Sequence, residues 1–248
     1  YAIDAEKLRQ ALGKIVIAAA KNEIRPELSG LYAGFFTDRY QGLVLAATDS
    51  YRLAETRVPV AQGSDEIRCI IPARTAYEMV RLISLGKEGE AETQVRLFVG
   101  DNQIALRYNG FEMTSRLVDG TYPDYAQIIP ANFKTTATFP IDVMMNKIKA
   151  AGLFTTMGVN AVSFDLNAAD KNIAVSSTST QTGQHDSKID ADVAGEENSI
   201  LLNHRYVLDG LQQMDGEAEF KVNSSDTPCL FMPKGSVDYL YVVMPIRQ

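Results

Sequence analysis

The feature that most constrains the fold is a fourfold recurrence of helix signals along the 248-residue chain. Helix starts are predicted near residues 4, 72, 141 and 203, so consecutive starts are separated by 68, 69 and 62 residues. Several short strands follow each predicted helix, and such a recurrence is the signature of a chain built from repeated units. The pattern predicts an α+β protein with two similar domains, each built from two helix-plus-strands units.

Local signals support these helix starts. The first helix begins at Asp4, which is a good N-cap, and its apolar residues, such as Leu8 and Leu12, recur at helical spacing as far as about residue 21. The second helix is predicted from Pro72 to about residue 85. Residues 70–77 and 201–208 match piece by piece, since each begins with an apolar pair and then enters a helix.

The stretch 115–125 near the middle of the chain separates the two halves. It begins as the end of a strand, breaks at the turn pair Asp119-Gly120 and then passes a proline. We interpret it as a strand leaving one domain, followed by an ordered extended connector that enters a second domain. An ordinary loop is the alternative that these residues leave open. The expected domains are 1–127 and 128–248.

Composition defines the class of protein. The chain is 46% hydrophobic and 22% charged, as expected of a globular protein with a buried core. Its net charge of −7 argues against a protein that binds nucleic acid non-specifically over its whole surface, although a local basic face remains compatible with it. No apolar run approaches the ~20 residues of a membrane span. The start shows no signal-peptide pattern and lacks an initiator methionine, so one interpretation is that the chain is part of a longer one.

The sequence offers few groups suited to catalysis. No Gly-rich loop ends in Lys-Ser or Lys-Thr, and the two histidines have no metal-ligand spacing. We expect His185 to be exposed, and His204 to lie at the surface or to cap a helix. Asp49 and Asp119 follow strands and are better explained as turn formers. We therefore expect no catalytic residue, no metal site and no cofactor.

The two cysteines, Cys69 and Cys229, both lie in apolar strand-like runs. We expect buried, reduced thiols, with a disulfide between them as the less favoured alternative. Reduced thiols favour a cytoplasmic protein.

Basic residues recur on all four predicted helices. Taken singly, such residues are typical of solvated helix faces. Their presence on four equivalent helices indicates a common surface that meets phosphates without reading bases. The residues are Lys7, Lys14, Lys21, Arg74, Arg81, Lys147, Lys149 and Arg205.

The C-terminal stretch 241–248 is an apolar strand that runs almost to the last residue. Because chain ends are usually polar and frayed, this end needs a partner surface, which is either internal or external.

Four stretches resemble the bacterial sliding clamp, the beta subunit of DNA polymerase III: residues 47–54, 115–125, 203–208 and 241–247. They come in the family's order and span nearly the whole chain. The family chain has three similar domains, and Tyr1 falls at the start of the second, so the resemblance covers domains two and three. The family's ring is a head-to-tail dimer closed by contacts between first and third domains. The resemblance therefore implies a ring homodimer only when the first domain is present.

The resemblance implies a DNA-clamp fold with helices on the inner side and antiparallel sheets outside. It implies a non-catalytic, cytoplasmic processivity factor that encircles duplex DNA without sequence specificity. Its implied partners are DNA polymerase III subunits, the clamp loader and other proteins carrying clamp-binding motifs, with no membrane involved. Two other hypotheses stay open: a stand-alone peptide-binding module that forms no ring, and an enzyme whose site is assembled from scattered residues.

The resemblance also implies a partner-binding cleft on the third domain near the connector. Leu53, Val242 and Met244 are expected to help form an apolar pocket for a partner's Leu or Phe. Tyr206 and Arg52 would supply an amphipathic wall with hydrogen bonds. The implied cleft residues are Leu28, Thr48, Ser50, Tyr51, Arg52, Leu53, Pro123, Ile128, Asn203, Tyr206, Pro228, Val242, Met244, Pro245, Ile246 and Arg247.

Two stretches depart from the family pattern. Ser50-Tyr51 stands where the family often has Gly-His. Pro26 and Glu27 follow Arg25 where the best-known members carry aromatic residues that touch DNA. This departure leaves Arg25 as the DNA-facing residue implied at that loop.

Overall fold

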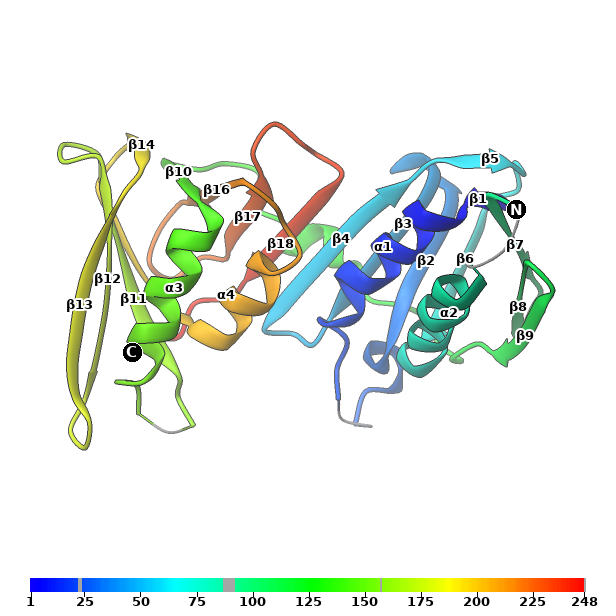
Figure 1. The fold of residues 1–248 in the computed structure, drawn as a ribbon, viewed down its shortest axis with the longest axis horizontal. Coiled ribbons are helices and arrows are strands. Elements are labelled where there is room, and N and C mark those ends of the chain that lie inside the picture. Colours follow the sequence, from blue (N-terminus) through cyan, green and yellow to red (C-terminus); the bar gives the residue numbers. More distant parts are fainter. Residues whose placement is uncertain (22–23, 87–91, 157, 248) are drawn as a thin grey trace. The chain divides into compact units, whose positions relative to one another are not determined.

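The computed structural model describes residues 1–21, 24–86, 92–156 and 158–247, and the chain divides into two compact units, Tyr1–Asp124 and Tyr125–Gln248 (Figure 1). The boundary expected after residue 127 falls within the short 3-10 helix η3 (Tyr125–Ile128), which opens the second unit. Each unit contains two of the four α-helices of the described residues, and every strand pair described below is antiparallel.

The first unit consists of two sheets and two helices. Its strands form the orders β4-β3-β2-β6 and β5-β1-β7-β8-β9. The elements are β1 (Ala2–Asp4), α1 (Ala5–Val16), η1 (Pro26–Ser29), β2 (Gly30–Thr37), β3 (Tyr40–Thr48), β4 (Arg52–Val58), β5 (Val60–Gln62), β6 (Ile67–Pro72), α2 (Ala73–Leu85), β7 (Gln94–Val99), β8 (Gln103–Tyr108) and β9 (Phe111–Arg116).

The second unit repeats this plan. Its strands form the orders β14-β10-β16-β17-β18 and β13-β12-β11-β15. After η3 the elements are β10 (Thr135–Pro140), α3 (Ile141–Gly152), β11 (Ala161–Asn167), β12 (Asn172–Ser179), β13 (Gly183–Asp190), β14 (Asp192–Gly195), β15 (Asn198–Asn203), α4 (His204–Leu211), β16 (Glu217–Val222), β17 (Cys229–Pro233) and β18 (Tyr239–Val243).

Strand pairing confirms the predicted repeat and shows how two repeats become one domain. The strand that precedes each helix pairs with a strand of the other repeat: β1 with β7, β6 with β2, β10 with β16 and β15 with β11. The first strand of every repeat thus pairs with a strand of the other repeat in its unit. A single repeat therefore cannot complete its own sheet. Two repeats are therefore the smallest unit that completes both sheets.

The helices begin where the sequence predicts and bury one face. Asp4 caps α1, with its Oδ1 accepting a hydrogen bond from the Lys7 amide at 2.9 Å. The first helix ends at Val16 rather than near residue 21, because the chain turns back there and the Ala20 amide donates to the Leu28 carbonyl. Pro72 is the cap of α2 rather than its first helical residue.

Within each unit the two helices lie next to each other and contact strands of both sheets (Figure 1). In the first unit α1 contacts β4 of one sheet and β1 of the other, and α2 contacts β6 of one sheet and β8 of the other. In the second unit α3 contacts β12 and β13, and α4 contacts β15 and β18. None of the helices in these described segments has the length and apolar character that a membrane crossing requires.

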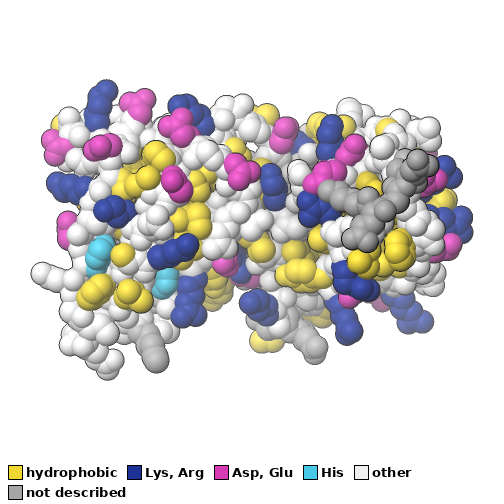
Figure 2. Space-filling model, in the orientation of Figure 1, with side chains coloured by type: hydrophobic (Ala, Val, Ile, Leu, Met, Phe, Trp, Pro, Cys, Tyr) yellow, Lys and Arg dark blue, Asp and Glu magenta, His cyan; other side chains and the backbone are white. Residues whose placement is uncertain are grey.

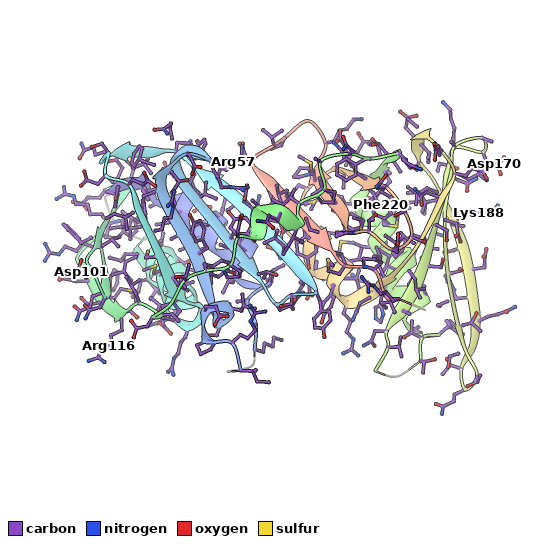
Figure 3. The ribbon with its side chains drawn as sticks, turned by 180° about the vertical axis from the view of Figure 1, so that it is seen from behind. Arg57, Asp101, Arg116, Asp170, Lys188 and Phe220 are labelled. Atoms are coloured by element: carbon purple, nitrogen blue, oxygen red, sulfur yellow. The ribbon has the colours of Figure 1, made fainter. Side chains whose placement is uncertain are left out.

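Aromatic rings form the centre of the second unit's core. Phe220, labelled in Figure 3, stacks on Phe231 with ring centroids 4.3 Å apart. Phe164 of the other sheet meets Phe220 edge-on at 6.0 Å. These rings join the two sheets of the unit through β11, β16 and β17.

Candidate functional site

The implied cleft residues come from both units, and each unit positions its own share. In the first unit they gather at the β3–β4 turn and at the connector. In the second unit they gather at the start of α4, at the β16–β17 turn and in the C-terminal segment.

Asp49 builds the β3–β4 turn, as its predicted role requires. Its Oδ1 accepts hydrogen bonds from the amides of Tyr51 and Arg52 at 3.0 and 3.1 Å, and its Oδ2 accepts one from Arg52 Nε at 3.0 Å. Thr48 Oγ1 donates to the Arg52 carbonyl at 2.6 Å and accepts from the Ser50 amide at 3.1 Å. The turn is therefore a closed network of local hydrogen bonds.

The turn exposes one implied cleft residue and buries another. Tyr51 is 63% exposed, whereas Arg52 is only 6% exposed. The Arg52 guanidinium forms an ion pair with Asp49. Tyr51 is therefore the more accessible side chain of the two. Ser50 between them adopts a φ of 77°, in the left-handed region that favours glycine.

The connector is anchored to this turn by a residue that sequence reasoning missed. The Tyr122 hydroxyl accepts a hydrogen bond from the Thr48 amide at 3.0 Å, and its ring lies 5.7 Å from that of Tyr32. Burial raises the pKa of Tyr122 well above its ordinary value of 10. The Val118 amide also donates to the Ile70 carbonyl at 2.9 Å. The stretch before Pro123 is therefore ordered, which agrees with its interpretation as an ordered connector.

In the second unit, close packing of α4 on β18 positions Tyr206. Asn203 caps α4, with its Oδ1 accepting from the Arg205 amide at 3.0 Å. The Tyr241 hydroxyl donates to the Tyr206 carbonyl at 2.9 Å. A Cβ at Gly210 would lie 2.2 Å from the Tyr241 ring, so only glycine permits this approach.

The C-terminal segment is part core and part surface. Val242 of β18 is fully buried, whereas Met244, Pro245 and Ile246 are half-buried. The Ile246 amide donates to the Leu201 carbonyl at 2.8 Å and so fixes the segment beside β15. The segment therefore presents apolar side chains from a backbone held in place.

Burial separates accessible from supporting members of the implied cleft. Leu28, Thr48, Arg52 and Leu53 are buried in the first unit, and Val242 is buried in the second. The members that keep exposed surface are Ser50, Tyr51, Pro123, Ile128, Asn203, Tyr206, Pro228, Met244, Pro245, Ile246 and Arg247.

A groove of about 670 Å³ lies in the second unit beside the C-terminal segment. Of the implied cleft residues, it contains Ile246 and Arg247. Its other lining residues gave no signal in the sequence, because serines and aliphatic residues occur on most strands. They are Ser163, Ser199, Ile200, Leu201, Ser225 and Asp226.

The implied DNA-facing residues lie on α1–α4 or directly after α1. Arg25 pairs with Glu27 at 3.1 Å and Arg81 with Glu78 at 2.8 Å. Within the described residues, six others form no ion pair: Lys7, Lys21, Arg74, Lys147, Lys149 and Arg205. Figure 2 shows dark-blue side chains among acidic and apolar ones on the helix-bearing face of each unit. The face is mixed rather than strongly basic.

Both histidines differ from expectation. His204 is buried, with Nδ1 2.9 Å from the Asn160 carbonyl oxygen, because α4 packs its first residue against Gly152 of α3. His185 is half-buried, since its ring stacks on Phe154 at a centroid distance of 5.8 Å. Burial is the main cause that lowers the pKa of His204 below 6.5.

Both cysteines are free thiols, but only Cys229 is fully buried. Cys69 is half-buried, and burial raises the pKa of its thiol to about 12. Across the segments that the structure describes, no group of three His, Cys, Asp or Glu residues is arranged to hold a metal ion.

Two consecutive α+β domains, each made of two strand-exchanged repeats with paired helices, define the DNA-clamp fold. Solved clamps share it. The Bacillus subtilis DNA polymerase sliding clamp aligns with a TM-score of 0.91 and 25% identity, over 100% of this chain and 64% of its own. The Thermotoga maritima DNA polymerase III beta subunit aligns with a TM-score of 0.91 and 24% identity, over 100% of this chain and 65% of its own.

Sequence comparison identifies the family. Residues 2–124 match the model of the DNA polymerase III beta subunit central domain, and residues 126–247 match that of its C-terminal domain. The chain therefore belongs to the DNA polymerase III beta subunit family. The beta sliding clamp of Synechocystis sp. is 28% identical over 97% of this chain and 63% of its own length. The chain thus spans less than two thirds of the length of such relatives.

Proposed function

We propose that this chain forms the second and third domains of a bacterial DNA sliding clamp, a non-catalytic processivity factor that tethers replication proteins to DNA in the cytoplasm. The main observation in support of this proposal is that the chain matches the central and C-terminal domains of the family in order. The apolar Met244–Ile246 segment, held on the second of these domains, keeps accessible surface. Such a surface needs a partner.

We infer that the basic helix residues face duplex DNA. Lysine and arginine side chains contact phosphates without reading the base sequence, which suits a protein that must slide. The acidic total charge and the mixed helix face favour loose contact over tight adhesion. Retention on DNA would then come from a closed ring, which requires a first domain and a second copy of the chain.

We further propose that partners dock through a short linear motif on the accessible cleft residues. The expected partners are DNA polymerase III subunits, the clamp loader and other motif-bearing proteins. Met244 suits an adaptable pocket because its thioether chain repacks around different apolar side chains. Tyr206 and Tyr51 would offer ring surface together with a hydroxyl. A motif peptide must order on binding, so we expect modest affinity.

The test is a titration of a fluorescently labelled peptide, carrying a glutamine followed by hydrophobic residues, against the wild-type chain and two variants. Met244→Ala and Tyr206→Ala are each expected to weaken binding about tenfold or more, because a few anchors of ~2 kcal/mol dominate such interfaces. Met145→Ala on α3 is the matched control, since Met145 is also half-buried and lies outside the proposed cleft. Unchanged affinity in both folded variants would place the partner site elsewhere.

A further inference from the structure

We propose that the groove beside β15 binds an extended segment of the partner that adjoins its motif, and that this segment carries a basic residue. The inference rests on the proposed function, because it assigns a second contact to a partner already held at the Met244–Ile246 segment. The inference extends the partner site to residues outside the implied cleft. It also assigns a chemical preference to the partner residues that flank the motif.

The position of the groove supports a continuation of the cleft. Ile246 and Arg247 line one side, so the groove begins where the apolar C-terminal segment ends. Its other walls come from β11, from β15 and from the turn between β16 and β17. A volume of about 670 Å³ accommodates several extended residues, whereas an isolated side chain needs far less space.

The wall formed by β15 is the edge of a sheet. In the order β13-β12-β11-β15, β15 has a neighbouring strand of its own sheet on one side only. The Ile246 amide donates to Leu201 on the other side, so Leu201 and Ser199 point their backbone groups away from β11. Within the described residues, the Leu201 N–H and the Ser199 C=O on this edge form no hydrogen bond. An extended peptide can therefore add to the part of this edge near Ser199 that the Ile246 contact leaves open.

Charge around the groove selects the occupant. Asp226 lines the groove, and an adjoining pocket of about 290 Å³, which shares Ser199, contains Asp165 and Glu197. None of these three carboxylates forms an ion pair within the described residues, although Asp165 accepts a hydrogen bond from Ser199 Oγ. Arg247 is the single basic residue in the groove lining, and its charge acts on Asp226. A hydrogen bond from Ser224 lowers the pKa of Asp226, which stays ionised. The excess of negative charge favours a lysine or arginine in the bound segment.

The experiment compares peptides that share the motif and differ in what flanks it. One carries the motif alone, two carry a Lys-Arg pair with a short spacer on either the N-terminal or the C-terminal side, and two carry Glu-Glu in its place. Fluorescence anisotropy measures their affinity for the wild-type chain at two salt concentrations. We expect one of the Lys-Arg peptides to bind about three- to tenfold more tightly than the motif alone, with a gain that falls as salt rises. The Glu-Glu peptides should show no gain.

Substitutions in the groove test whether the gain in affinity of the Lys-Arg peptide arises there. Ser199→Trp fills the groove from an exposed strand position, and Asp226→Asn removes a charge without changing shape. Both are expected to reduce the gain while leaving the affinity of the motif-only peptide unchanged. Thr178→Trp on β12 and Asp186→Asn on β13 are the controls, because they introduce the same side chains at exposed strand positions outside the groove lining.

The outcomes separate this inference from the proposed function. If the motif-only peptide fails to bind, both are wrong. If it binds and no Lys-Arg peptide gains affinity, or if the gain survives in both Ser199→Trp and Asp226→Asn, the groove inference is overturned and the cleft remains. A gain lost in these two variants and kept in the two controls supports it.

Discussion

At the scale of single residues, backbone geometry decides which side chains the β3–β4 turn tolerates. Ser50 holds a φ of 77°, a region that costs non-glycine residues about 1–2 kcal/mol. Its amide still donates to Thr48 Oγ1, and this bond needs no serine side chain. Ser50, where the family often has Gly, is therefore strained, and within the described residues the structure records no hydrogen bond of its hydroxyl that would compensate.

Ser50→Gly is thus expected to stabilise the chain. The relief of strain is offset in part by the extra freedom of glycine in the unfolded chain, so the free energy of unfolding should rise by about 0.5–1 kcal/mol. Chemical denaturation of both proteins measures the change. A loss of stability would show that the serine hydroxyl has a partner that outweighs the strain.

His204 makes stability depend on pH. Burial lowers its pKa below the ordinary 6.5, although the Asn160 carbonyl opposes the shift. The unfolded chain therefore takes up a proton first, so the contribution of His204 is fully present above about pH 6.5 and is lost as pH falls through the lower folded pKa. Thermal unfolding from pH 8 to 5 should show a falling midpoint, and His204→Gln should flatten part of that slope. An identical slope in the variant would contradict this assignment.

Residue roles differed in how far the sequence could predict them. Asp4 and Asp49 could be assigned because capping and turn formation are local. The burial of His204 and Arg52 could not, because it depends on elements distant in sequence. Tyr122 was missed for the same reason, since its partner Thr48 lies 74 residues away.

At the scale of elements, the start of each helix was predictable and its end was not. Caps and apolar periodicity mark the start of a helix locally. The early end of α1 instead depends on a hydrogen bond from the Ala20 amide, just after α1, to the Leu28 carbonyl of η1. The groove beside β15 was also unpredictable, because it is formed by four separate segments of the second unit. Such sites arise only when the sheet is assembled.

The contact between α4 and β18 depends on Gly210. Gly210→Ala would place a methyl group 2.2 Å from the buried Tyr241 ring, whose hydroxyl is held by the Tyr206 carbonyl. We expect a loss of about 1–3 kcal/mol in the free energy of unfolding, despite the better helix propensity of alanine. Gly13→Ala on α1 is the matched control, because no atom lies within 4 Å of its added Cβ. Gly13→Ala should be neutral or stabilising by up to about 1 kcal/mol, and an equal loss in both variants would refute the role of Tyr241.

At the scale of the whole molecule, the repeat was the most reliable sequence signal. Its period follows from element order alone, and element order does not depend on exact boundaries. The exchange of first strands between repeats was not foreseen, because strand pairing over long separations has no local signal. The family resemblance supplied the implied cleft residues, and the structure shows which of them are accessible.

Binding to duplex DNA is expected to be weak and independent of sequence. With a mixed helix face, this chain should bind in about the 10⁻⁴ to 10⁻⁶ M range or more weakly, and affinity should fall steeply with salt. Electrophoretic mobility shifts with two unrelated duplexes at several salt concentrations measure this. Tight binding to one particular sequence would be incompatible with a sliding clamp.

The second unit is proposed to receive a partner motif at its C-terminal segment. The most direct measurement is NMR of the chain labelled at its methionine methyl groups, titrated with the motif peptide. Met244 is expected to shift progressively, while Met79 of α2 and Met144 of α3, which are both buried, stay unchanged. Saturable shifts at other methionines with an unmoved Met244 would contradict the account, even though the clamp fold would stand.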